Sequence, residues 1–467
     1  MRKRVALGVS IPVVVVFIGI LIALLLPSNL LTLTEALDRL GLLGSRERIP
    51  GLIGTPPGDD APPDLLVRNG LLWDAAGGLR PNPGLYLVAG RISGAAPSGH
   101  PRIIDATGMT ILPGLIDMHV HSFGGTFGDE MMIGSGITTA RDLGTQLAGA
   151  LRHRQESASG VRIGPRLFVT GPYLVSGAAT GDQEIGVSSP ETAAALVRRF
   201  ADAGVDGIKV HSGIDEATLR AVVAEAHKRG LWVAAHLDRV DAVQASGIGV
   251  DTIEHASGID LEEGHAADAR REAAIGAMVA GHVALTPTLV VAEHAFTIAE
   301  LGRPDNPALR FVPRFMRRFW IASQLANARA EELTPLETEK RRGRLGRLER
   351  FVLRFHQAGG RVLAGTDTPA FLVAPGIDMH REIELLVEAG LTPAEALASA
   401  TSEAAAAMGR AGELGGLAPG CRADLLIVEG NPFSGAPRAD ITRDIRLVVK
   451  DGRILLRRPS SAEVGAN

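Results

Sequence analysis

The chain is poor in cysteine and has no excess of positive charge. A single thiol, Cys421, in 467 residues excludes an intrachain disulfide framework and any zinc site built on several thiolates. A metal bound here must therefore use nitrogen and oxygen ligands. The formal net charge of -4 lacks the basic excess typical of nucleic-acid-binding proteins, so we expect no nucleic-acid partner. With 46% hydrophobic and 21% charged residues, the composition is otherwise globular, and the length suggests two or three structural units.

A long uncharged run stands near the N-terminus. Residues 5–26 carry no charge and follow three basic residues, Arg2, Lys3 and Arg4. A helix of this length rises about 33 Å, enough to cross a hydrocarbon core of about 30 Å. We therefore expect residues 1–26 to form a signal anchor, a transmembrane helix that places the catalytic domain outside the cytoplasm, on the periplasmic or extracellular side. A cleaved signal peptide and a buried helix of a soluble protein are the alternatives, but no small-x-small cleavage site follows the run.

The rest of the chain divides into a linker, two β-rich flanks and a long α/β middle. Residues 27–62 contain proline- and glycine-rich text and predict a linker with one short helix. Short apolar runs separated by turns predict small strands at 63–113 and again at 411–467. We expect these two flanks to pair into one composite β-sandwich beside the middle segment, residues 114–410.

The middle segment predicts a closed (β/α)8 barrel, the TIM barrel, because short apolar strands alternate with amphipathic helices over about 300 residues. The candidate strands are 115–121, 136–144, 166–171, 207–211, 232–237, 252–256, 283–289 and 362–368. An open doubly wound sheet is the alternative, but no glycine-rich phosphate-binding loop follows an early strand. An insertion at about 290–360 predicts extra helices, which either form a lid or a surface for anionic headgroups, or pack on the barrel as a solvated hairpin.

Ionisable side chains stand at the ends of the predicted strands, where barrel enzymes place their active sites. His119 and His121 lie two residues apart on the first strand and therefore point to the same face. The other candidates end the fourth, fifth, sixth and eighth strands; they are Lys209, His236, His255 and Asp367. A lone histidine is usually a structural residue, but the joint placement of all six favours a metal centre.

The residue types fit hydrolytic chemistry. Imidazole and carboxylate ligands suit one or two divalent ions, Zn²⁺ first, although Mn²⁺, Fe²⁺ and Co²⁺ also fit. A coordinated water loses its proton near pH 7 and becomes a hydroxide nucleophile, while the ion polarises a substrate carbonyl. Asp367 can take the proton from the water and pass it to a leaving nitrogen. The pattern therefore predicts a metal-dependent hydrolase.

Three segments resemble the amidohydrolase superfamily. IDATGMTILPGLIDMHVH, at 104–121, is similar to its sandwich-to-first-strand signature, and GLAPGCRADLLIVEGNPF, at 416–433, is similar to its returning sandwich segment. LLVEAGLTPAEALASAT, at 385–401, resembles its final barrel helix. The resemblance extends from about residue 64 to the C-terminus. It is closest to the branch of imidazolonepropionase-like proteins and metal-dependent, prolidase-like dipeptidases.

The resemblance implies a ligand set. His119, His121 and Asp367 would hold a first metal, and His236 and His255 a second. Lys209 would bridge both as a carbamate formed with CO₂; the alternative is a Lys209 ammonium group paired with Asp238.

Substrate contacts are expected at two further residues. His211 lies two residues beyond Lys209 on the same face, although it could simply cap the strand. Tyr173 lies in GPYLVSGAATGDQE, where many relatives carry a Gly-Gly-His segment instead.

These residues favour hydrolysis of an amide or peptide-like C–N bond in a small substrate, such as a dipeptide or a cyclic amide. The alternative is a mononuclear deaminase of a heterocyclic amine, with His119, His121, His236 and Asp367 around one metal and His255 orienting water. Lys209 discriminates between them, because only a binuclear enzyme needs a bridging group. A non-catalytic scaffold with the same fold would be expected to lack a ligand, and no ligand is missing.

Overall fold

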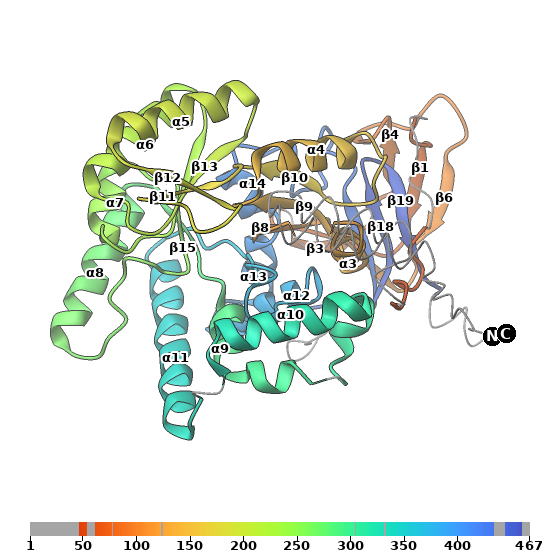
Figure 1. Ribbon diagram of the computed structural model, residues 1–467. Coiled ribbons are helices and arrows are strands. Elements are labelled where there is room, and N and C mark those ends of the chain that lie inside the picture. Colours follow the sequence, from red (N-terminus) through yellow and green to blue (C-terminus); the bar gives the residue numbers. More distant parts are fainter. Residues whose placement is uncertain are drawn as a thin grey trace, which may run out of the picture.

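The computed structural model describes residues 46–53, 61–76, 78–122, 125–303, 305–330, 333–433 and 444–459. A helix-covered barrel and a layer of β-sheet lie side by side (Figure 1). The expected signal anchor, residues 1–26, lies outside the described residues. Among the residues that are described, no helix is both long and apolar enough to cross a membrane.

Parallel strands form the wall of the barrel. In chain order they are β8 (Leu115–Val120), β9 (Ile137–Asp142), β10 (Arg166–Val169), β13 (Gly207–Val210), β14 (Trp232–Ala235), β15 (Thr252–Glu254) and β16 (Ala284–Thr286). The sheet runs without a break from β8 to β10 and from β13 to β16. The two parts are joined where the Asp206 N–H donates a hydrogen bond to the Val169 carbonyl at 2.8 Å.

An extended segment closes the barrel where the sequence predicts an eighth strand at 362–368. It forms isolated parallel bridges, Leu285 with Val362 and Val120 with Thr368, and not a continuous strand. The predicted strand is wrong in this respect because Asp367 has a left-handed φ of 57°, which interrupts the extended backbone. The seventh predicted strand, 283–289, is also too long, since Thr288 has a φ of 48° and the next helix begins at the following residue.

Helices cover the outside of the barrel (Figure 1). The helices are α3 (Thr126–Gly134), α4 (Leu147–Ala158), α5 (Pro190–Ala203), α6 (Glu216–Lys228), α7 (Ala242–Ile248), α8 (His265–Ala280), α12 (Ile377–Glu388), α13 (Pro393–Ser399) and α14 (Ser402–Ala407). Ser189 and Asp215 cap the N-termini of α5 and α6, because their side chains accept the backbone N–H of Thr192 and of Thr218.

Two short strands that were not predicted from the sequence follow β10 in the chain and extend the sheet beside β13. They are β11 (Tyr173–Ser176) and β12 (Glu184–Val187), which pair in parallel. β11 also pairs with β13 through Leu174 and Val210. Tyr173 is thereby fixed beside the barrel and does not lie on a free loop.

The two β-rich flanks of the chain meet in one sheet. β17 (Leu425–Glu429) pairs antiparallel with β7 (Met109–Pro113) along its whole length. The six-stranded sheet has the order β19-β18-β17-β7-β2-β3, and a four-stranded sheet, β5-β4-β1-β6, accompanies it. The remaining strands are β1 (Leu65–Arg68), β2 (Leu71–Asp74), β3 (Gly78–Pro81), β4 (Leu85–Val88), β5 (Arg91–Ser93), β6 (Arg102–Asp105), β18 (Ile445–Lys450) and β19 (Arg453–Arg457).

Residues 46–53, which the sequence analysis assigns to a linker, pack against the folded body. Ile49 is buried, and Leu52 forms an antiparallel bridge with Leu456 of β19. Burial of Ile49 accounts for this docking, because Gly134 leaves the space that the Ile49 side chain occupies. The Glu47 N–H also donates to the Arg310 carbonyl at 2.9 Å.

The insertion is helical and lies against the barrel (Figure 1). It consists of α9 (Leu289–Leu301), the 3-10 turn η2 (Pro307–Phe311), α10 (Arg314–Asn327) and α11 (Pro335–Gln357). The Trp320 indole N–H of α10 donates to the carbonyl of Pro369, just beyond the closing segment, at 3.0 Å. Helix α10 therefore holds the chain that follows Asp367.

Arg166 joins the barrel to the sandwich. Its guanidinium lies 2.5 Å from Asp424 and 2.5 Å from Asp451, which flank two sandwich strands. We expect Arg166→Met to lower the free energy of unfolding by about 3–5 kcal/mol, because it leaves the buried Asp424 carboxylate without this cation, whereas Asp451 keeps Arg422 at 2.9 Å.

The matched control for this prediction is Arg198→Met, since Arg198 forms an exposed pair with Glu225 at 3.5 Å. Its loss should cost about 0–1 kcal/mol. Calorimetric unfolding of both variants tests the comparison, and equal losses would contradict it.

Candidate metal centre

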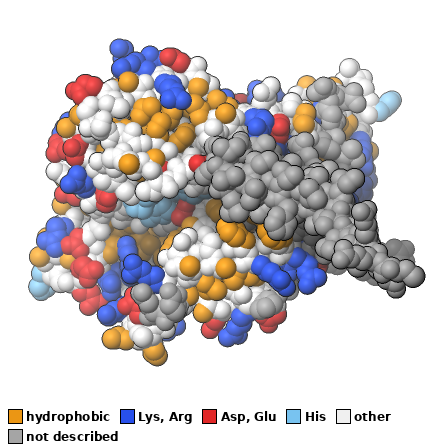
Figure 2. All heavy atoms as spheres, in the orientation of Figure 1, with side chains coloured by type: hydrophobic (Ala, Val, Ile, Leu, Met, Phe, Trp, Pro, Cys, Tyr) orange, Lys and Arg blue, Asp and Glu red, His pale blue; other side chains and the backbone are white. Residues whose placement is uncertain are grey.

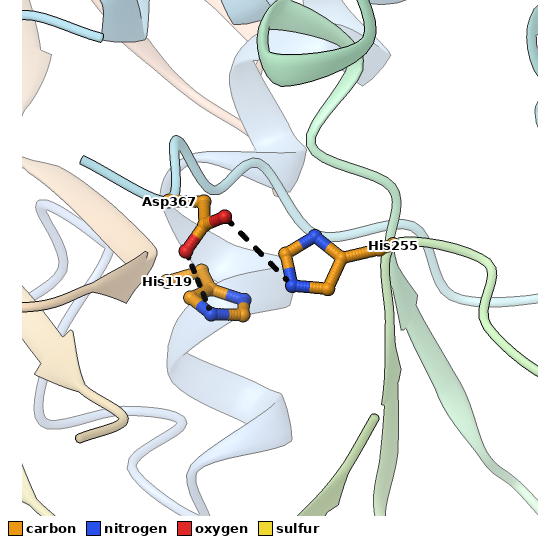
Figure 3. Close-up of side chains that lie close together, drawn as sticks. All are labelled: His119, His255 and Asp367. Atoms are coloured by element: carbon orange, nitrogen blue, oxygen red, sulfur yellow. Dashed lines mark ion pairs between the residues drawn. The ribbon is translucent and has the colours of Figure 1, made fainter. Parts of the chain in front are cut away.

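Three side chains from distant parts of the chain converge at the C-terminal end of the barrel (Figure 3). The His119 Nε2 lies 3.3 Å from Asp367 Oδ1, and the His255 Nε2 lies 3.9 Å from Asp367 Oδ2. One ligand atom from each of the three residues lies within 4.8 Å of the others. The His121 Nε2 also lies 3.1 Å from Asp367 Oδ1. His119, His255 and Asp367 are therefore close enough to hold one metal ion.

The backbone at this cluster is unusual. His255 and Asp367 have φ angles of 60° and 57°, in the left-handed region that non-glycine residues rarely adopt. Each follows the extended backbone of its barrel segment directly, so the chain turns sharply where the ligand atom is needed. Such conformations cost about 1–3 kcal/mol and persist because the surrounding structure enforces them.

A buried ion pair orients His119. The His119 Nδ1 lies 2.8 Å from Glu254 Oε2, while Glu254 Oε1 accepts the Arg141 guanidinium at 2.7 Å and the Thr252 hydroxyl at 2.6 Å. Because Nδ1 donates to the carboxylate, Nε2 keeps its lone pair for the centre. The sequence analysis missed Glu254 and Arg141. The available signal was a charged residue inside an otherwise apolar strand.

Asp117 ties the first barrel strand to the closing segment. One of its carboxylate oxygens accepts the backbone N–H groups of His119 and Thr366, at 3.1 and 3.0 Å, and the other accepts the Thr366 hydroxyl at 2.7 Å. Complete burial raises the pKa of Asp117 to about 7, against the lowering effect of these bonds. This residue, also missed from the sequence, holds the ligand-bearing segments in register.

Burial keeps most of the imidazoles neutral. It lowers the pKa of His119 well below its usual range and, together with neighbouring charges, brings the pKa of His255 to about 3 and of His236 to about 4. Burial alone would raise the pKa of Asp367, but the surrounding imidazoles hold it well below its usual range. His121 differs: burial lowers its pKa, yet the hydrogen bond and charge of Asp367 produce a net rise. Neutral imidazole and ionised carboxylate are the forms that bind metals.

Lys209 lies in β13 with 1% of its surface exposed. Among the described residues its Nζ has no hydrogen-bond partner, and burial lowers its pKa to about 8. The structure shows no hydrogen bond between Lys209 and Asp238, whose carboxylate accepts the Gly213 N–H at 2.8 and 3.0 Å.

Aromatic rings extend the site away from the central cluster. The His255 ring lies 5.0 Å from that of His236, which lies 4.2 Å from His211, which in turn lies 4.8 Å from Tyr173. The two residues expected to contact substrate thus continue the row of candidate ligands. His255 approaches Asp367 as well, at 3.9 Å, beside the nearer His119 and His121.

The donor set fits a divalent cation. The His119 Nε2 and the His236 Nδ1 are both buried and, within the described part of the chain, lack hydrogen-bond partners. Unpartnered buried polar atoms are costly, and a bound cation with nitrogen and oxygen ligands would satisfy such atoms.

The comparisons with known proteins agree with this geometry. Residues 110–455 match the profile of the amidohydrolase family. The enamidase of Eubacterium barkeri is 22% identical over 380 residues, which cover 77% of this chain and 84% of the enamidase.

Two solved structures are similar along almost their whole length. A Bifidobacterium longum protein provisionally classed as a prolidase is 26% identical, with a TM-score of 0.68, and the match covers 87% of this chain and 98% of that protein. A Xaa-Pro dipeptidase with bound methionine in its active site is 25% identical, with a TM-score of 0.63, and the match covers 84% of this chain and all of the dipeptidase.

Other curated matches are short. The dihydroorotase of Solibacter usitatus is 43% identical over 60 residues, and adenine deaminase 2 of Rhizobium etli is 46% identical over 66 residues. The chain thus spans 14% and 11% of the lengths of these two relatives.

Removing the charge of Glu254 should weaken metal binding. Glu254→Gln keeps the shape of the side chain but loses the carboxylate that orients His119, so we expect metal affinity to fall about 10–100-fold. Glu272→Gln is the matched control, because Glu272 pairs with Arg354 on the surface. Competition with a chromogenic chelator measures both, and a wild-type affinity for Glu254→Gln would contradict the assigned role.

Gly365 should not tolerate a side chain. A Cβ there would lie 2.5 Å from Thr286 Cγ2 and 2.9 Å from the backbone nitrogen of His119. Gly365→Ala should therefore cost about 1–3 kcal/mol of stability and reduce the bound metal. Gly276→Ala, on α8 with open space around its Cβ, is the control. Thermal unfolding and metal content are measured for both, and equal behaviour would contradict this packing argument.

Proposed function

The chain belongs to the amidohydrolase family and is a hydrolase, and from this premise we propose that it cleaves an amide or peptide-like C–N bond in a small substrate, a dipeptide or a cyclic amide. The observation that carries the proposal is the group of His119, which is buried, with His255 and Asp367, which are partly buried, at the C-terminal end of the barrel. The similarity to a Xaa-Pro dipeptidase over 84% of this chain supports the peptide-like substrate.

We assign the metal ligands to His119, His121, His236, His255, Lys209 and Asp367, with zinc as the expected ion. A divalent cation held there would supply an activated water nucleophile and polarise the scissile carbonyl. His119 and His121 project from one face of β8, and the Glu254 carboxylate fixes the orientation of the first of them.

Asp367 is proposed to move the proton. Its carboxylate lies among imidazoles that favour the ionised form, and only the ionised form can accept a proton from the attacking water. The same carboxylate then delivers that proton to the leaving nitrogen. His211 and Tyr173, farther along the row of rings, are proposed to contact the substrate.

Lys209 is proposed to be carboxylated. A neutral amine forms a carbamate when its nitrogen attacks CO₂ and a proton is released. The lowered pKa of Lys209, about 8, makes the neutral amine accessible near neutral pH. The buried Nζ has no hydrogen-bond partner among the described residues, so carboxylation would not break an existing hydrogen bond.

One observation favours a second candidate, a mononuclear deaminase of a heterocyclic amine. The compact group within 4.8 Å contains ligand atoms for a single ion. In that case His119, His121, His236 and Asp367 would hold the ion, His255 would orient the water, and Lys209 would have no bridging role.

For the location of the enzyme, we propose a membrane anchor formed by residues 5–26, with the catalytic domain on the periplasmic or extracellular side. The support for this is the uncharged run and the basic residues before it.

Metal content and hydrolysis, measured on the full chain purified with bicarbonate, test the proposed function. We expect about two divalent ions per chain and hydrolysis of dipeptides or cyclic amides. Lys209→Gln should reduce metal affinity about 10–100-fold and abolish most activity. Lys228→Gln, which changes an exposed lysine on α6, is the matched control.

One ion per chain, with unchanged metal content in Lys209→Gln, would overturn the binuclear site. Release of ammonia from heterocyclic amines by the same preparation would then favour the deaminase.

A further inference from the structure

Helix α10 presents an apolar stripe to solvent. Phe315 and Phe319 are 55% and 61% exposed, one helical turn apart. Ala322 and Ala326 continue the same face, and both are exposed. Exposed phenylalanines are costly on a surface that contacts only water, so this stripe points to a partner.

Cations border the stripe. Arg314 and Arg318, each next to an exposed phenylalanine, are exposed themselves and lie one turn apart. Aromatic side chains flanked by arginine on one face of a helix match the composition of helices that lie in the interface of a membrane with anionic lipids.

The opposite face of α10 packs beside the metal centre. The Trp320 indole donates to the Pro369 carbonyl at 3.0 Å, and the Gln324 side chain accepts the Phe371 N–H at 2.8 Å. Pro369 is two residues beyond Asp367, so α10 lies at the catalytic end of the barrel. Figure 2 shows pale-blue histidine side chains in a hollow on the face where Figure 1 places α10.

The described N-terminal segment arrives at the same place. Glu47 forms a backbone hydrogen bond with Arg310, four residues before α10 begins, and its carboxylate lies 3.6 Å from the Arg310 guanidinium. The uncharged run ends at Leu26, and twenty residues of chain can reach at most about 70 Å. A membrane that held residues 5–26 would therefore lie within reach of α10.

We propose that α10 is a membrane-contacting helix that seats the catalytic end of the barrel on an anionic lipid bilayer. Phe315 and Phe319 enter the acyl-chain boundary, while Arg314 and Arg318 contact the headgroup phosphates. The active-site opening then lies close to the bilayer, which favours substrates that partition into it. This inference does not depend on which C–N bond the enzyme cleaves.

Tryptophan quenching by brominated lipids tests the proposal. The full chain carrying Phe319→Trp is reconstituted with vesicles of phosphatidylcholine and phosphatidylglycerol that contain brominated acyl chains. The matched control is Val161→Trp, because Val161 is 62% exposed and precedes β10, at the opposite end of the barrel. The emission of the wild-type chain, with its three tryptophans, is subtracted from both.

We expect the added emission of Phe319→Trp to be quenched at least about twofold more than that of Val161→Trp, and the difference to shrink when Arg314→Gln and Arg318→Gln are added. Equal quenching of the two tryptophans would overturn the proposal. So would unquenched, blue-shifted emission of Phe319→Trp, which would mean that residues 27–45 or a second copy of the chain covers the stripe.

Discussion

The site depends on charge that is buried at the end of the barrel. Arg141, Glu254, His119 and Asp367 form a continuous chain of ionisable groups, all within hydrogen-bond or ion-pair distance of the next. Isolated charges in such a position would be strongly destabilising, so each group requires its neighbours. These four residues come from β9, β15, β8 and the closing segment. The barrel must therefore be closed before their side chains can contact one another. The fold and the candidate metal site are therefore one cooperative structure.

Most of the fold could be predicted because its signals are local. Alternating apolar strands and amphipathic helices indicated the barrel. The predicted amidohydrolase family and enzyme class are confirmed by the family match over residues 110–455. The wrong predictions concern segments whose conformation is determined by contacts with residues far away in the sequence. The closing segment is held by isolated bridges to β8 and β16, and residues 46–53 are docked by the burial of Ile49. Neither contact leaves a periodic pattern in the sequence.

The part of the candidate site that could be predicted consists of residues at the ends of strands. Position at the end of a strand was enough to select His119, His255 and Asp367, which the structure brings within 4.8 Å. The partners behind them were not selected, because Glu254 and Arg141 look like ordinary charged residues until the barrel is closed. The exact positions of the ligand atoms were not predictable either, since they depend on left-handed turns at His255 and Asp367. The metal ligands, the substrate and the location of the protein stay proposals.

Anomalous X-ray diffraction from crystals of the metal-loaded full chain tests whether the cluster is a binuclear metal centre. We expect two anomalous peaks at the C-terminal end of the barrel, one of them beside His119 and Asp367, with electron density for a carboxylate on the Lys209 Nζ. A single peak with an unmodified Lys209 would contradict the binuclear centre. The lack of any peak near Asp367 would contradict the assignment of this cluster as the metal site.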